Sequence, residues 1–245
     1  MNKPKMIIFD YGQTLVNERC FDVMKGTEAV LREASKNQNK ISVEEIQVFA
    51  NELNKELGRY GVEFEKQSVL EVHNHIFQNY IYEYFGIELT KSANEVEQIF
   101  ENSASDAEPT KNIIEFLHFL DKSQIRTSVL SNISFSGDIL KENINKYIPS
   151  HKFEFIIASS EYIFRKPHKR IFELALRKAN LDPCDVWYVG DNAVFDIDGA
   201  TDCGISAVWY KGAIEKSNKY IPKRNCLEIN DWNELIDIMS RANIS

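Results

Sequence analysis

Polar and charged residues follow short apolar runs at four places in this 245-residue chain. These places are residues 6–9 with Asp10 next, residues 127–130 with Ser131 and Asn132 next, residues 153–158 with Lys166 shortly after, and residues 186–189 with Asp191 and Asp196 after them. A carboxylate can attack phosphorus and form an aspartyl-phosphate. A second carboxylate beside it is tolerated when Mg²⁺ lies between them, while lysine and hydroxyl groups neutralise phosphoryl oxygens. These residue types therefore indicate phosphoryl transfer at a Mg²⁺ site.

The hydrophobic pattern predicts the elements that bring these segments together. Predicted strands at 6–9, 127–130, 153–158, 186–189 and 205–209 alternate with predicted helices at 113–120, 135–148, 172–179 and toward residue 204. Such alternation is typical of βαβ units and a mostly parallel sheet. Ligands of open parallel sheets lie at the carboxyl ends of the strands, so the polar segments should meet at one rim. The predicted fold class is therefore α/β, with a Rossmann-like core.

Residues 18–105 show helical patterns and no clear strand signal. Ser42 with Glu45 and Ser68 with Glu71 both fit the capping box, a serine followed three residues later by a glutamate. Apolar stripes follow each box, at positions 46, 49, 50, 53 and 57 and at positions 72, 76, 80 and 84. We therefore predict that residues 1–17 and 106–245 form the α/β core, and that residues 18–105 are a helical insertion.

Charge and cysteine content limit the compartment and the partners. The formal net charge of −8 disfavours nucleic acid and anionic membranes as partners. Four cysteines without CxxC spacing argue against a zinc site or a disulfide framework, and no apolar run reaches the length of a signal peptide or a membrane span. A cytoplasmic protein is the simplest interpretation. Because the chain is so acidic, a phosphorylated substrate would need a bound cation or local hydrogen-bond donors to offset the negative electrostatic potential.

The four segments taken together resemble the motifs of the haloacid-dehalogenase superfamily. They occur in the family's order: Asp10 with Thr14 and Leu15, then Ser131 and Asn132, then Lys166 and Pro167, then Gly190 and Asp191 with Asp196. Gly199, Ala200 and Gly204 also fit the last motif. The helical stretch between the first and second motifs matches the position of the family's helical cap. The resemblance implies a Rossmann-like core with an inserted α-helical cap domain.

The resemblance also implies roles for individual residues in a Mg²⁺-dependent phosphatase that acts on a small phosphorylated metabolite. Asp10 would be the nucleophile and a Mg²⁺ ligand. Two further Mg²⁺ ligands would be the Gly12 carbonyl and Asp191, with Asp196 in support. Phosphate would be held by Ser131, by the Asn132 backbone and by Lys166, which would also damp repulsion between the carboxylates.

One position departs from the family pattern. Phosphatases of this family usually carry a second aspartate two residues after the nucleophile, as an acid/base, and this chain has Gly12 there. A positioned acid/base typically contributes about 10²–10⁴-fold in rate. The alternatives are therefore a slow phosphatase, a catalytically impaired binding or regulatory protein of the same fold, and a 2-haloacid dehalogenase, which Gly190 and Asp191 disfavour. Asn17 and Glu18 lie where the chain enters the insertion and could line the pocket. The sequence specifies neither the substrate nor the oligomeric state.

Overall fold

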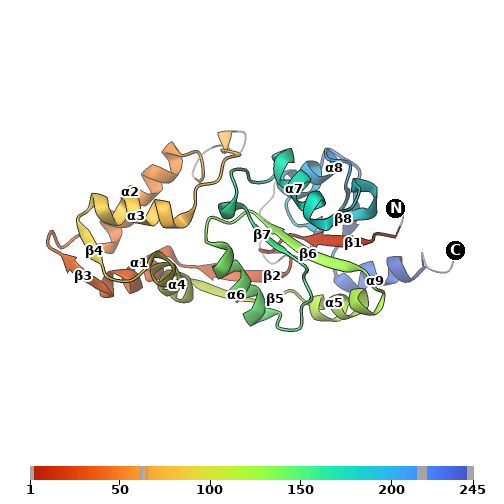
Figure 1. Ribbon diagram of the computed structural model, residues 1–245, viewed down its shortest axis with the longest axis horizontal. Coiled ribbons are helices and arrows are strands. Elements are labelled where there is room, and N and C mark those ends of the chain that lie inside the picture. The colour runs from red at the N-terminus through yellow and green to blue at the C-terminus, as the bar shows by residue number, and fades with distance from the viewer. Residues whose placement is uncertain (1–2, 61–62, 64–65, 214–219, 242–245) are drawn as a thin grey trace.

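A six-stranded parallel sheet forms the centre of the protein, in a computed structural model that describes residues 3–60, 63, 66–213 and 220–241 (Figure 1). The strand order is β10-β9-β8-β1-β6-β7, and every neighbouring pair is parallel. The strands are β1 (Met6–Phe9), β6 (Arg126–Ser131), β7 (Ile156–Ala158), β8 (Val186–Gly190), β9 (Ser206–Tyr210) and β10 (Leu227–Ile229). The predicted α/β class with a mostly parallel sheet is confirmed.

Helices cover both faces of the sheet, which is why β1 is apolar at every position. Ile7 and Phe9 pack into the core on one face, and Met6 and Ile8 pack into the core on the other, as period-2 alternation requires. The first face is covered by α5 (Ile113–Lys122), α6 (Gly137–Tyr147) and α9 (Trp232–Arg241). The second is covered by α7 (Lys169–Ala179), the π-helix η4 (Ala193–Asp198) and the short α8 (Gly199–Thr201). Single 3₁₀ turns, η2 (Ser159–Glu161) and η3 (Pro183–Asp185), precede α7 and β8.

A helical unit with its own core lies beyond the carboxyl end of the sheet, at the left of Figure 1. It contains α1 (Val23–Arg32), α2 (Val43–Glu56), α3 (Asn74–Tyr84) and α4 (Ala93–Ala104). Val30, Ile46, Ile81 and Val96, one from each helix, meet in its interior. Among the described residues, no helix has the length and apolar character needed to cross a bilayer.

Short strands interrupt this region, contrary to the expectation that residues 18–105 lack them. β2 (Val16–Phe21) pairs antiparallel with β5 (Ser105–Pro109), and β3 (Ala34–Asn37) pairs antiparallel with β4 (Ile87–Leu89). β3 reads ASKN and β5 reads SDAEP, so neither has the alternating or β-branched pattern of a strand. These segments form strands because the fold places each of them beside a pairing partner. The boundaries predicted at 17/18 and 105/106 fall inside β2 and β5 and stay a prediction.

The second predicted capping box is wrong. α3 begins at Asn74 with His73 as its N-cap, whereas Ser68 Oγ accepts a hydrogen bond from Leu70 N at 3.0 Å in a local turn. The carboxylate of Glu71 instead accepts a 2.7 Å hydrogen bond from Ser159 Oγ in the core. The stripe predicted behind this box is also wrong, since positions 76, 80 and 84 are among the exposed large hydrophobic residues.

The two serines give a matched test of these assignments. Ser42→Ala is expected to lower the free energy of unfolding by about 1 kcal/mol, because Ser42 and Glu45 form a complete capping box at the start of α2. Ser68→Ala should change it by less than about 0.5 kcal/mol, because Ser68 caps no helix. Urea unfolding of both variants measures the difference, and equal losses would contradict it.

Candidate active site

All seven residues predicted to form the site line one cavity of about 260 Å³ at the carboxyl end of the sheet. Asp10 directly follows β1, Ser131 ends β6, and Asp191 directly follows β8. β1 lies between β6 and β8, so these three strand ends are neighbours, although they are far apart in sequence. The other predicted members that line the cavity are Gly12, Asn132, Lys166 and Asp196.

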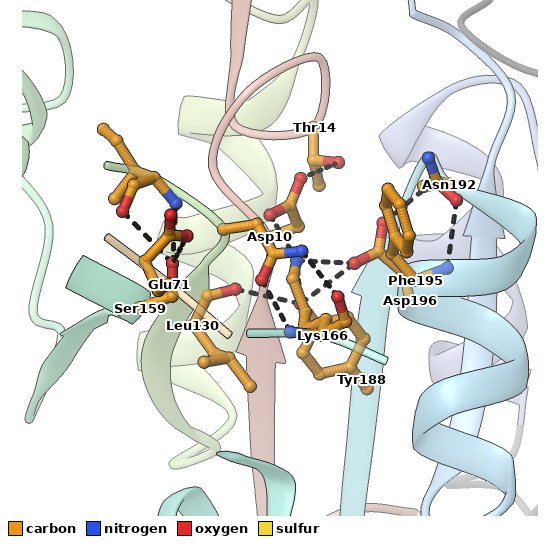
Figure 2. Close-up of polar contacts among 12 residues, drawn as sticks. Asp10, Thr14, Glu71, Leu130, Ser159, Lys166, Tyr188, Asn192, Phe195 and Asp196 are labelled. Atoms are coloured by element: carbon orange, nitrogen blue, oxygen red, sulfur yellow. Dashed lines mark hydrogen bonds and ion pairs between the residues drawn. The ribbon is translucent and has the colours of Figure 1, made fainter. Parts of the chain in front are cut away.

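Lys166 lies at the centre of the polar contacts in this cavity (Figure 2). Its Nζ donates to Asp10 Oδ1 and to Asp196 Oδ1, both at 2.6 Å, and to the hydroxyl of Tyr188 at 2.8 Å. The side chain is only 2% exposed, so these charge-assisted bonds form away from bulk water. The lysine therefore holds two carboxylates together that would otherwise repel each other.

The ionisation of this pair is set by burial and by mutual attraction. Burial raises the pKa of Asp10 to about 6, and the nearby Asp196 adds to this, while Lys166 acts against it. Burial lowers the pKa of Lys166, but the two carboxylates outweigh this, so that its pKa lies above the usual value of 10.5. Lys166 is therefore positively charged at neutral pH.

Three carboxylates form a cluster that could hold a metal ion. One oxygen from each of Asp10, Asp191 and Asp196 lies within 4.8 Å of the others. Hard carboxylate oxygens of this kind suit Mg²⁺. Both oxygens of Asp196 already have donors, because Oδ1 accepts from Lys166 and Oδ2 accepts from the Asn192 amide at 2.9 Å. Both oxygens of Asp10 also have donors, Lys166 for Oδ1 and Thr14 at 3.5 Å for Oδ2, so these hydrogen bonds do not rank the three carboxylates as metal ligands.

Gly190 is required by a close approach of side chain to backbone. A Cβ atom at this position would lie 2.3 Å from Cγ of Asp196, far inside van der Waals contact. Only glycine therefore lets Asp196 pack against the end of β8 and reach Lys166.

Asn132 plays a part that the sequence did not reveal. Its side chain forms two hydrogen bonds with the backbone of Lys166. Asn132 Nδ2 donates to the Lys166 carbonyl at 2.9 Å, and the Lys166 backbone N–H donates to Asn132 Oδ1 at 2.7 Å. The amide side chain thus fixes the loop that carries the lysine. Ser131 lies beside it at the cavity wall, 3% exposed.

Tyr188 is a site residue that sequence reasoning missed. Its hydroxyl donates to the Leu130 carbonyl at 2.9 Å and accepts from Lys166 (Figure 2). It lies within β8, where its ring fits the apolar pattern of the strand and packs edge-on against Phe172. The feature of the sequence that could have identified Tyr188 was its hydroxyl group, since a buried tyrosine usually has a hydrogen-bond partner.

Tyr188→Phe is expected to lower the free energy of unfolding by about 1–2 kcal/mol, because it keeps the ring but leaves the Leu130 carbonyl without its donor. Tyr84→Phe is the matched control, because Tyr84 is 61% exposed. Chemical denaturation of both variants measures the effect. A loss at Tyr188 no larger than that at Tyr84 would rule out a structural role for the hydroxyl.

Glu18 lies beside the position where the family acid/base is missing. A Cβ atom on Gly12 would be 3.1 Å from Glu18 Oε2 and 3.4 Å from its Cδ. The carboxyl group of Glu18, carried by β2, therefore borders the space that a side chain at position 12 would fill. Of the two residues expected at the cap entrance, Glu18 lines the catalytic cavity and Asn17 is not among its lining residues.

A second cavity of about 490 Å³ lies between the helical unit and the core. It shares five lining residues with the catalytic cavity, namely Tyr11, Glu18, Tyr60, Asn132 and Ile133. Its other walls come mainly from α2, α3 and α4, with apolar, aromatic and carboxamide side chains. A molecule that reacts at Asp10 can therefore extend into this second cavity, which we call the distal cavity.

Comparisons with known proteins identify the family and the fold. A family model described as haloacid dehalogenase-like hydrolase matches residues 7–210. A glyceraldehyde 3-phosphate phosphatase from Methanothermobacter thermautotrophicus is 31% identical over 136 residues, which cover 54% of this chain and 58% of that protein. The chain thus spans less than two thirds of the length of the curated relatives that it matches.

Solved structures share the fold over nearly the whole chain. A 2-haloacid dehalogenase from Pseudomonas syringae pv. tomato superposes with a TM-score of 0.65 at 21% identity, covering 98% of this chain and 99% of that one. A phosphatase from Thermococcus onnurineus superposes with a TM-score of 0.62 at 19% identity, covering 98% of each chain. Since a dehalogenase and a phosphatase both share the fold, the chemistry has to be inferred from the site.

Proposed function

Since the chain belongs to the haloacid dehalogenase-like hydrolases, we propose that it hydrolyses a small phosphomonoester through an aspartyl-phosphate on Asp10. The observation that carries this proposal is the buried contact of Lys166 with both Asp10 and Asp196 beside a third carboxylate, Asp191. Phosphatase chemistry needs such a cationic and acidic cluster, and a curated relative is named as a phosphatase.

We propose Mg²⁺ as the cofactor, held by Asp10, Asp191 and the carbonyl of Gly12. When bound, the ion supplies positive charge that offsets the carboxylates and the phosphoryl oxygens. The residues fit this role, because the cluster offers hard oxygen atoms from three neighbouring carboxylates.

The chain's own residues divide the work of phosphoryl transfer. Asp10 attacks phosphorus, its carboxylate takes up the phosphoryl group, and the alcohol of the substrate leaves; water then hydrolyses the acyl phosphate and restores Asp10. Ser131 and the backbone at Asn132 bind phosphoryl oxygens, and Lys166 neutralises charge on them. The helical unit acts as a cap that limits access of bulk water.

Glu18 is the group that we propose for proton transfer. A departing alkoxide needs a proton, and Gly12 has no side chain to supply one. The Glu18 carboxyl group lies next to the position of a residue-12 side chain and faces the same cavity. A proton held on Glu18 Oε2 would therefore pass to the leaving oxygen, as the family aspartate would do it.

The proposed substrate is a small phosphorylated metabolite, and nucleic acids and membranes are not proposed as partners. The net charge of −8 disfavours both polyanions. The four cysteines are present as free thiols, which suits a reducing cytoplasm as the place of action.

Phosphate release from a panel of phosphomonoesters, with Mg²⁺ and with EDTA, tests the function. We expect release with Mg²⁺ and a loss on the order of 10²-fold or more with EDTA. Halide release from 2-chloropropionate is measured in parallel and should be undetectable. Activity on the chloroacid would favour the dehalogenase, and no turnover of the whole panel would favour the binding protein, in which Mg²⁺ or phosphate should still raise the melting temperature.

A further inference from the structure

The distal cavity contains a buried cation that the proposed chemistry does not use. Arg59 lines this cavity and is only 3% exposed. Its Nε and Nη1 are buried and have no hydrogen-bond partner among the described residues. A guanidinium group is always charged and offers five N–H donors, so leaving them unpaired in a buried place is costly.

Two aromatic residues surround the guanidinium group, and Tyr60 also makes a side-chain hydrogen bond with it, yet Nε and Nη1 have no acceptor in the described part of the chain. Its Cζ lies 4.9 Å from the ring centroid of Phe77 and 5.6 Å from that of Tyr60. Such aromatic faces support a planar cation and leave its edges available to a ligand. Tyr60 also lines the catalytic cavity, so this cation lies along the path from Asp10 into the distal cavity.

The charges next to Arg59 do not cancel. Arg59 and Arg165 both interact electrostatically with Glu71, a carboxylate with no exposed side-chain surface. Glu71 is already engaged, because it accepts from Ser159 Oγ and lies 3.6 Å from Nε of Arg165. Among the described residues, the two guanidinium groups thus share the Glu71 carboxylate. Burial also lowers the pKa of Arg59, and this outweighs the opposite effects of Tyr60 and Glu71.

A single negative charge on the ligand fits this place better than a second phosphate does. Glu18 and Glu101 also line the distal cavity, so a dianion there would meet additional negative charge. Asn54 Oδ1, another buried atom of this cavity, has no partner in the part of the chain that the structure describes, and it adds an acceptor and no positive charge. A carboxylate matches the donors of Arg59 in charge and in geometry.

We propose, on the premise of the phosphomonoesterase activity above, that Arg59 binds a carboxylate on the leaving-group side of the substrate. The substrate class is then the phosphate esters of hydroxy acids. The phosphoryl group of the substrate lies at Asp10, its carbon chain passes Tyr60, and its carboxylate accepts hydrogen bonds from Nε and Nη1 of Arg59. The reaction product would be the free hydroxy acid.

Two pairs of substrates, each a carboxylate and the carboxamide of nearly the same shape, test the proposal. One pair is 4-carboxyphenyl phosphate and 4-carbamoylphenyl phosphate, and the other is the phosphate ester of 3-hydroxypropanoate and that of its amide. We expect the native enzyme to prefer the carboxylate by about 10- to 100-fold in kcat/KM in at least one pair. Arg59→Gln should reduce this ratio to near one, and Arg59→Lys should leave an intermediate ratio.

The measured quantity is the ratio of kcat/KM for the carboxylate to kcat/KM for the carboxamide within each protein. A change in overall activity therefore does not affect the conclusion. Arg32→Gln is the matched control, because Arg32 lies on the helical unit with a 70% exposed side chain paired to Glu28. It should keep the native ratio. A native ratio near one in both pairs, or a ratio that survives Arg59→Gln, would overturn the proposal.

A binding measurement separates this proposal from the proposed catalytic function. In Asp10→Asn, 4-hydroxybenzoate should raise the melting temperature in a concentration-dependent manner, and 4-hydroxybenzamide should not. Adding Arg59→Gln should abolish that shift. If no ester is hydrolysed but the shift follows Arg59, the catalytic function fails while the carboxylate site stands; if esters are hydrolysed without charge preference and no shift occurs, the carboxylate site fails alone.

Discussion

Asp10→Asn is expected to reduce phosphate release by at least about 10⁴-fold while the protein stays folded. Asparagine has nearly the same shape as aspartate but cannot attack phosphorus, so the covalent step is lost rather than weakened. The remaining buried contact of Lys166 with Asp196, at 2.6 Å, keeps the cation paired. Phosphate release at saturating Mg²⁺ and capture of the phosphorylated Asp10 peptide after acid quenching measure the effect directly.

The same substitution should not destabilise the metal-free protein at neutral pH. The folded-state pKa of Asp10 is about 6, above its usual value of 3.8, so the charged carboxylate is less favourable in the folded state than in the unfolded state. This unfavourable contribution is present above pH 6 and fades as the pH falls toward 4. We therefore expect Asp10→Asn in EDTA to melt at the same temperature as the native protein or higher.

Asp202→Asn is the control for Asp10, because Asp202 is an exposed partner of Arg224 and does not line the catalytic cavity. It should retain native phosphate release. Mg²⁺-dependent turnover that survives Asp10→Asn would rule out the aspartyl-phosphate mechanism, and a phosphorylated peptide from another region would identify a different nucleophile.

The core could be predicted from sequence because its signals are local and agree with one another. Fully apolar runs such as residues 6–9 are typical of strands that are covered on both faces, and β1 is buried at every position. Asp10, Ser131 and Asp191 then follow at strand ends, so the parallel arrangement itself brings them to one rim. This is why all seven predicted residues line one cavity.

The helical unit was predicted less well because its contacts are not local. The pairing of β3 with β4 joins segments about 50 residues apart, and neither strand has a strong strand pattern of its own. Glu71 fits a capping box by spacing, but contact with Ser159 in the core determines its place. Tertiary contacts override local signals of this strength.

Two residues, Tyr188 beside Lys166 and Arg59 in the distal cavity, were missed for a related reason. The hydroxyl of Tyr188 positions Lys166 from within a strand, where the pattern indicates only a buried ring. Arg59 follows α2 without any motif, and its significance appears only once its burial and unpaired donors are known. Sequence spacing reports the strand ends, whereas these side chains depend on packing across elements.

Glu18→Gln is expected to lower kcat/KM by about 10²–10³-fold for alkyl phosphates and by less than about 10-fold for 4-nitrophenyl phosphate. An alkoxide is a poor leaving group and needs a proton as the P–O bond breaks, whereas 4-nitrophenolate leaves readily as the anion. A merely structural role for Glu18 would affect both substrates equally. The dependence of log kcat/KM on leaving-group acidity should therefore be steeper in the variant than in the native enzyme.

The control for this variant is Glu108→Gln on β5, which pairs with β2, because the Glu108 side chain is partly exposed (41%) and contacts only Arg19 in the described hydrogen bonds. It should leave both substrates unaffected. Equal losses on both substrates after Glu18→Gln, or none, would remove Glu18 from the proton-transfer step.

Restoring the family aspartate at position 12 should help only when Glu18 is neutral. In Gly12→Asp the new Cβ lies 3.1 Å from Glu18 Oε2, so two carboxylates would compete for the same space and repel each other. We expect this single variant to be no faster than the native enzyme on alkyl phosphates. The double variant Gly12→Asp/Glu18→Gln should recover at least about 10-fold of the activity lost in Glu18→Gln, because one proton carrier again stands beside the leaving oxygen. Additive effects of the two substitutions would mean that the groups act independently, and Glu18 would then not occupy the functional place of the missing aspartate.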